Sequence, residues 1–127
     1  MAVPYLCILA AYALVYLPRF VFVTPAMVKQ GYDNAEPREQ QKTVGGVARR
    51  ALAAHQNGFE TFAPFVAGVL MAQAAGAPVE TITQWSLAFV ASRVVYIAAY
   101  VLGWHALRRV AWGVSAAATV MLMVAGV

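Results

Sequence analysis

Four long runs of mostly apolar residues, separated by short polar stretches, form the pattern of this chain. They cover about residues 4–28, 47–75, 79–103 and 108–127. A helix crosses the hydrocarbon core of a bilayer, about 30 Å thick, with about 20 residues, because each residue adds about 1.5 Å. Backbone polar groups in lipid must be satisfied within the segment, which favours helices over strands. The pattern therefore predicts four transmembrane helices.

The composition agrees with a membrane protein of one domain. Of the 127 residues, 62% are hydrophobic and 11% are charged, whereas soluble domains are about half apolar and about a quarter charged. A core in a chain this short cannot hide so much apolar surface, so the excess must face lipid or partner subunits. We predict an all-α membrane protein, a four-transmembrane-helix bundle in which residues 1–127 form a single domain.

The basic residues indicate how the helices are oriented. The connection 104–108 contains His105 and Arg108, whereas the turn at residues 76–78 has no Lys or Arg. Because cytoplasmic loops carry the excess of Lys and Arg, we predict that the connections 29–50 and 104–108 are cytoplasmic and that both termini lie outside. The net charge of +4 is then explained by the bilayer, and no nucleic-acid partner is expected. The first connection holds Lys29, Arg38, Lys42, Arg49 and Arg50.

Polar residues of the second helix lie on one stripe. Arg50, Asn57 and Glu60 are seven and three residues apart, and at about 100° per residue these offsets bring all three to one side. Glu60 lies about 15 Å along the axis from Arg50, well inside the membrane. A carboxylate at that depth requires a proton or a cation.

The third helix supplies a cation. Arg93 is followed by Tyr96 and Tyr100 on the same stripe. The tight turn at residues 76–78 makes the second and third helices antiparallel neighbours, and counting outward from it places Arg93 at the depth of Glu60. We therefore expect a buried Arg93–Glu60 pair, within one subunit or across an interface. The residues alone leave two interpretations open: a polar contact that fastens the helices together, or a cavity that accepts an anionic ligand.

Metal chemistry is not expected. Cys7 is the only cysteine, so the chain has neither an internal disulfide nor a thiolate cluster. The two histidines, His55 and His105, are too few for a zinc site without carboxylates.

The motifs on the second and third helices resemble those of a known family. The run 50–65, RALAAHQNGFETFAPF, is similar to the second-helix signature of the MAPEG family, the membrane-associated proteins in eicosanoid and glutathione metabolism. The third-helix pattern of Arg93, Tyr96 and Tyr100 resembles the leukotriene and prostaglandin synthase members, and the linker 31–38 resembles that of many bacterial members. The resemblance implies a homotrimer of four-helix bundles, here in a bacterial inner membrane, with glutathione bound between neighbouring subunits from the cytoplasmic side.

The resemblance also implies roles for individual residues. At the start of the fourth helix it implies a catalytic arginine, either Arg109, which we prefer, or Arg108. A cation beside a bound thiol lowers the pKa of that thiol. A thiol of pKa about 8.5 is only about 3% thiolate at pH 7, and lowering its pKa by two units gives roughly 75% thiolate. The residues that match glutathione-contacting positions of the family are Arg50, Asn57, Glu60, Arg93, Tyr96 and Tyr100.

This chain departs from the family pattern at three positions. Active members carry an arginine where this chain has Ala53, and the prostaglandin enzyme often has a basic residue where Gln56 stands. Losing a charged anchor costs about 1.5–3 kcal/mol of ligand binding, although Arg50 lies one turn away on the same stripe. The third position is Val110, which replaces a hydroxyl residue of prostaglandin-type enzymes and disfavours that isomerase activity.

The leading hypothesis is a membrane-bound glutathione-dependent transferase or peroxidase that acts on lipophilic electrophiles. The thiol enters from the cytoplasm, and the electrophile comes from the bilayer beside the first and fourth helices. One alternative is a non-catalytic lipid-binding protein or scaffold of the same fold, which the absence of a charge at Ala53 favours. The other is an accessory or structural subunit of a larger membrane complex.

Overall fold

The computed structural model describes residues 1–127, and its regular structure is entirely helical. The elements α1, η1 and α2 follow one another without interruption and form one helix of 29 residues, Ala2–Gln30. The elements in chain order are α1 (Ala2–Pro18), the π-helical segment η1 (Arg19–Val23), α2 (Thr24–Gln30), α3 (Pro37–Gln41), α4 (Gly46–Ala74), α5 (Val79–Leu102) and α6 (His105–Val124).

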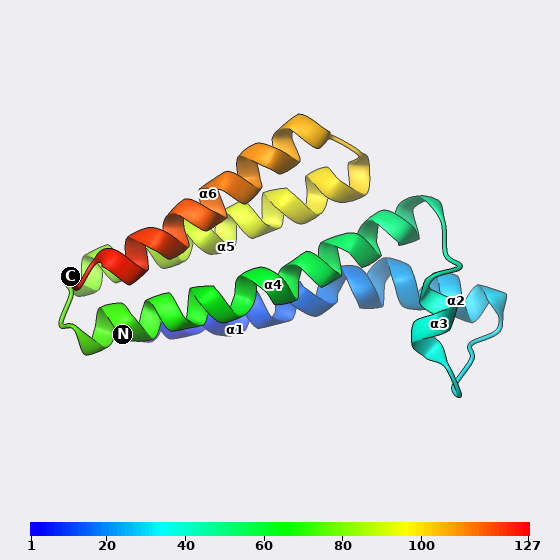
Figure 1. Ribbon diagram of the computed structural model, residues 1–127, viewed down its shortest axis with the longest axis horizontal. Helices are drawn as coiled ribbons and strands as arrows, with labels where there is room; N and C mark the ends of the chain where they lie inside the picture. Colours follow the sequence, from blue (N-terminus) through cyan, green and yellow to red (C-terminus); the bar gives the residue numbers. More distant parts are fainter.

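Successive long helices run antiparallel to one another along the long axis of the bundle (Figure 1). Both termini and the α4–α5 turn lie at one end of the bundle, and the α1–α4 connection with α3 lies at the other. Gly76 (φ 75°) follows α4 and Gly103 (φ 77°) follows α5. Glycine adopts this left-handed conformation at no steric cost, so these two positions end the helices and allow tight reversals.

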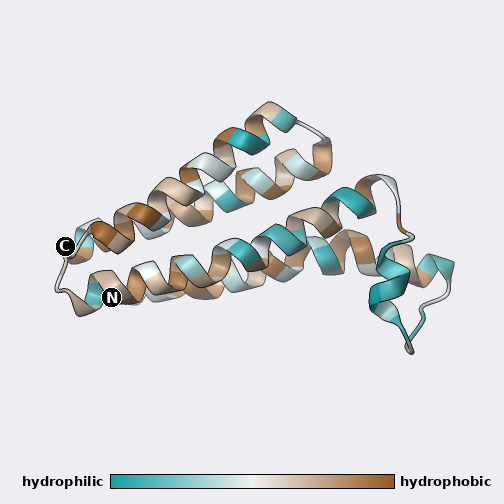
Figure 2. Ribbon diagram, viewed as in Figure 1, coloured by the Kyte–Doolittle hydropathy of each residue, from teal (hydrophilic) through white to brown (hydrophobic).

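Three helices are long and apolar enough to cross a membrane: Ala2–Gln30, Val79–Leu102 and His105–Val124. Helices of this length and apolar composition are typical of integral membrane proteins. Helix α4 has 29 residues, ample length for a span, but it is not one of these three. Figure 2 shows hydrophilic positions along the first half of α4 and others near the start of α6. A fourth span therefore stays a prediction.

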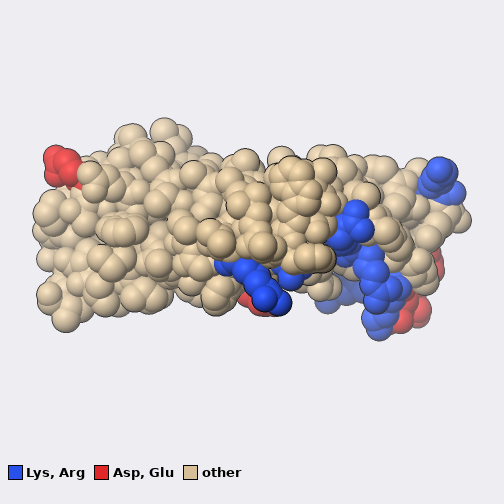
Figure 3. Space-filling model, turned by 90° about the horizontal axis from the view of Figure 1, so that it is seen from above, with Lys and Arg blue, Asp and Glu red and all other residues tan.

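The charged residues are unevenly distributed over the bundle. On the face shown in Figure 3, Lys and Arg lie between the middle of the molecule and the end that holds the α1–α4 connection, and the opposite end carries only an acidic patch. The sequence agrees, because residues 61–92 contain no Lys or Arg and one carboxylate, Glu80.

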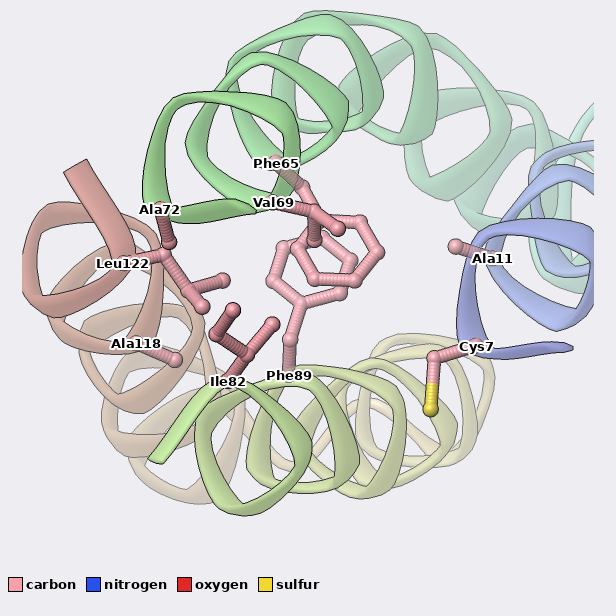
Figure 4. Packing of buried hydrophobic residues seen from close by; sticks show 9 residues of the cluster. All are labelled: Cys7, Ala11, Phe65, Val69, Ala72, Ile82, Phe89, Ala118 and Leu122. Carbon is pink, nitrogen blue, oxygen red and sulfur yellow. The ribbon is translucent and has the colours of Figure 1, made fainter. Parts of the chain in front are cut away.

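The core consists of apolar side chains from all four long helices (Figure 4). At its centre the rings of Phe65 on α4 and Phe89 on α5 stack with their centroids 3.9 Å apart. Glycine allows two close helix approaches: a Cβ on Gly58 would lie 3.2 Å from the Val15 Cα of α1, and one on Gly68 would lie 3.0 Å from the Leu122 Cβ of α6. These contacts determine how α4 is rotated about its axis, and hence which of its residues face outward.

Candidate functional site

The first contact of the candidate site joins α4 to α5. Arg93 is only 3% exposed, and its Nη2 donates a hydrogen bond to Asn57 Oδ1 at 2.9 Å. Its Cζ lies 4.1 Å from the ring centroid of Tyr96, one turn further along α5. The other amino group, Nη1, is buried without a hydrogen-bond partner in the protein. The buried guanidinium thus holds Asn57 and Tyr96 in place.

The contacts continue toward the start of α6. The rings of Tyr96 and Tyr100 meet edge to face with centroids 5.6 Å apart. The Cζ of Arg108 lies 4.5 Å from the centroid of the Tyr100 ring, a cation–π distance. Asn57, Arg93, Tyr96, Tyr100 and Arg108 therefore form one continuous chain of contacts across three helices.

A recess of about 260 Å³ opens at the end of this chain of contacts. No carboxylate lines it, and the exposed Arg109 makes no hydrogen bond or ion pair, since the one salt bridge in the structure joins Lys42 to Glu39. Its charge is thus available to an anion. The recess is lined by Tyr96, Tyr100, Arg108, Arg109 and Trp112.

Arg50 lies outside this recess. Its Nε and Nη2 donate to the carbonyl oxygen of Val101 at 3.1 and 3.0 Å. Val101 is in the last turn of α5, where carbonyl groups lack partners within the helix. Arg50 thus caps α5 and ties it to α4.

The expected ion pair between Arg93 and Glu60 does not form within the chain, and in that form the prediction was wrong. Glu60 is exposed, and Asn57 takes the position opposite Arg93. Arg93 and Glu60 are at similar depth along the bundle, but pairing also depends on the direction in which each side chain leaves its helix. Each residue turns a helix by about 100°, so Glu60 lies about 60° further from the core side of α4 than Asn57 does.

A comparison with protein families shows to which family this chain belongs. One family, described as the MAPEG family, matches residues 3–127, nearly the whole chain. The chain belongs to the MAPEG family. Searches of curated proteins and of solved structures gave no match.

Sequence reasoning missed two features of this MAPEG protein. Trp112 lines the recess one turn after Arg108, a spacing that the sequence could have shown. The second is His55, which is buried and whose Nδ1 lies 2.6 Å from the carbonyl oxygen of Val15 on α1. A carbonyl only accepts, so Nδ1 carries the proton.

A second, larger recess of the MAPEG chain was also not predicted. It has a volume of about 550 Å³ and lies between the end of α1, the short helix α3 and the first half of α4. Arg19, Arg38 and Lys42 line it, together with His55. Residues far apart in the sequence build it, so no local pattern indicates it.

Proposed function

We propose that this MAPEG protein is a membrane-bound glutathione-dependent transferase or peroxidase that acts on lipophilic electrophiles. The observation that carries the proposal is the recess at the start of α6, where Arg108 and Arg109 meet Tyr96 and Tyr100 without any carboxylate. An anion is favoured there, because two cations with no acidic partner lower the free energy of a negative charge.

In this proposal Arg109 stabilises the thiolate. Its guanidinium is exposed and unpartnered, whereas that of Arg108 is held over the Tyr100 ring. The thiol loses its proton to solvent, and the sulfur attacks the electrophilic carbon, forming a C–S bond as the leaving group departs with its electron pair. With a hydroperoxide, the thiolate attacks the terminal oxygen and the O–O bond breaks, which leaves glutathione as its sulfenic acid; the departing alkoxide takes a proton from solvent to become the alcohol. A second glutathione then reduces the sulfenic acid to give the disulfide and water.

The proposed thiol site is completed by a second subunit of a homotrimer. The recess of about 260 Å³ falls below the roughly 300–1,000 Å³ of typical ligand pockets, so a tripeptide extends beyond it. On α4, Gln56 and Glu60 face outward, and polar groups at membrane depth normally face a bundle interior or a wet cavity. A neighbouring chain against α4 satisfies both requirements and makes α4 the fourth span. Asn57 and Glu60 then lie at the subunit boundary.

The positive-inside rule gives the orientation within this proposal. The end of the bundle with the α1–α4 connection faces the cytoplasm of a bacterial cell, and both termini face outward. Glutathione then reaches the start of α6 from the cytoplasm, while the electrophile comes from the bilayer.

Thiolate formation tests the proposal directly. Glutathione added to the purified protein should raise ultraviolet absorbance near the thiolate band, and the protein should conjugate a reactive aryl halide. Arg109→Ala should abolish both signals, and Arg108→Ala should weaken them. Arg49→Ala is the matched control, because Arg49 is an exposed arginine on α4 that does not line the recess. No absorbance change at saturating glutathione, or equal losses in Arg109→Ala and Arg49→Ala, would refute the proposal.

A non-catalytic lipid-binding protein is the second candidate. It is favoured by Ala53 on the polar stripe of α4 and by the burial of Arg93, which leave fewer cations for a peptide ligand. Two grooves are lined almost entirely by apolar residues, one of about 300 Å³ between α1 and α5 and one of about 340 Å³ between α5 and α6. Fatty acid or phospholipid that co-purifies with a protein inactive toward glutathione would favour this candidate over the enzyme.

A further inference from the structure

A small cavity lies inside the bundle, where α1, α4 and α5 meet. Its volume is about 10 Å³, and its walls include Arg93 on α5 and Thr61 on α4. It shares no lining residue with the recess at the start of α6. A cavity needs about 10–15 Å³ to hold one water molecule. This cavity therefore has room for a single water and excludes an organic ligand.

Arg93 brings to this cavity a hydrogen-bond donor that no group of the protein accepts. Its guanidinium belongs to the span Val79–Leu102 and is 3% exposed. Nη2 donates to Asn57 Oδ1, whereas Nη1 is buried without a partner in the protein. Such a donor is costly at membrane depth, because neither lipid tails nor apolar side chains accept a hydrogen bond.

Two groups on the other walls of the cavity are able to accept a hydrogen bond. The Thr61 hydroxyl donates its one proton to the carbonyl of Asn57 or of Gly58, both at 3.2 Å, so its lone pairs stay available. Leu14 of α1 also lines the cavity. In a regular helix its carbonyl oxygen accepts from the residue four positions later, but that residue is Pro18, which has no N–H.

We propose that one water molecule is bound in this cavity and joins α5 to α1 and α4. Its oxygen accepts a hydrogen bond from Arg93 Nη1, and its two protons are donated to Thr61 Oγ1 and to the carbonyl oxygen of Leu14. Buried waters typically make about three hydrogen bonds to polar groups that otherwise lack partners. The water holds the guanidinium in the rotation in which Nη2 meets Asn57. The site lies inside one chain, so the inference depends neither on the proposed activity nor on the homotrimer.

A crystal structure of the unliganded protein, at a resolution that shows ordered solvent, tests the inference directly. One density peak should lie about 2.7–3.2 Å from Arg93 Nη1 and within the same reach of Thr61 Oγ1. No peak at this position, where other buried waters are visible, or an Nη1 turned toward a protein acceptor, would overturn the inference. An anomalous signal at the peak in crystals grown with bromide would overturn it too, because a halide ion would then occupy the cavity.

Unfolding in sodium dodecyl sulfate gives a second, independent readout. Thr61→Val keeps the shape of the side chain and removes the acceptor, so it should raise the unfolding equilibrium constant about tenfold. Thr119→Val is the matched control and should change that constant less than about threefold. Thr119 is buried and its hydroxyl donates to the carbonyl four residues earlier, as that of Thr61 does, but it does not line the cavity.

The variant Arg93→Met separates the bridging water from the local effects of the Thr61 hydroxyl. In that background Thr61→Val should change the unfolding constant less than about threefold, because no guanidinium orients the water. Equal effects of Thr61→Val in the two backgrounds, or equal effects of Thr61→Val and Thr119→Val in the wild type, would refute the bridging water. If Arg93→Met fails to fold, the comparison with Thr119→Val still decides.

Discussion

Replacing Asn57 by alanine removes the one hydrogen-bond partner that the protein offers to a buried guanidinium. Arg93 is 3% exposed, its Nη2 donates to Asn57 at 2.9 Å, and its Nη1 has no partner. Hydrogen bonds to charged groups contribute about 1.5–3 kcal/mol, whereas neutral interhelical bonds in a membrane protein average about 0.6 kcal/mol. The bond from Arg93 to Asn57 has a charged donor, so it belongs with the hydrogen bonds to charged groups. We expect Asn57→Ala to lower the free energy of unfolding by about 2–3 kcal/mol.

A double-mutant cycle isolates this interaction from the other effects of each substitution. Arg93→Met removes the buried charge and keeps most of the side-chain volume. In that background Asn57→Ala should cost about 0.5 kcal/mol, since the amide has lost its donor. The coupling energy between the two sites should therefore be about 1.5–2.5 kcal/mol. Glu60→Gln is the control and should change stability by less than about 0.5 kcal/mol, because Glu60 is exposed and pairs with no cation in the chain.

Unfolding by sodium dodecyl sulfate in mixed micelles, followed by far-ultraviolet circular dichroism, measures all four corners of the cycle. A cost of 0.6 kcal/mol or less for Asn57→Ala would contradict the reasoning, because it would place the bond in the neutral class. A loss for Glu60→Gln as large as that for Asn57→Ala would show that Arg93 pairs with the carboxylate instead.

Three other substitutions on α4, with one control on α6, test the packing of α4 by the same unfolding measurement. Gly68→Ala should destabilise by about 1–3 kcal/mol, because its Cβ would lie 3.0 Å from Leu122 Cβ. The control is Gly113→Ala, whose Cβ would meet no atom within 4 Å, and it should stabilise by a few tenths to about 1 kcal/mol. Equal effects of the two substitutions would contradict the close contact between α4 and α6. Phe65→Ala should cost about 3–5 kcal/mol, since the ring is fully buried, and a loss below 1 kcal/mol would contradict the stacked core. His55→Ala should cost about 1–2 kcal/mol by removing the donor to the α1 carbonyl, and an unchanged stability would show that this carbonyl is satisfied otherwise.

Several features of the candidate site could be predicted from the sequence. Tyr96 and Tyr100 share a face of α5, and Arg108 follows at the start of α6, because spacing along one helix and across a two-residue connection is local geometry. The structure places these three around one recess. The placement of Arg50 could not be predicted in this way. Its contact with the last turn of α5 depends on how two helices pack, which no spacing along α4 shows.

The sequence by itself determined the long helices, their approximate ends and the residues that share a stripe on each, because helical periodicity depends only on the backbone. Tertiary structure alone decided which stripe faces which neighbour. The stacked rings of Phe65 and Phe89 and the close approach at Gly58 rotate α4 so that Asn57 reaches Arg93 and Glu60 faces outward. That rotation is the sum of many packing contacts between distant residues, so depth and periodicity along one chain segment do not contain it. For the same reason the recess around Arg19 became visible only when α1, α3 and α4 were assembled.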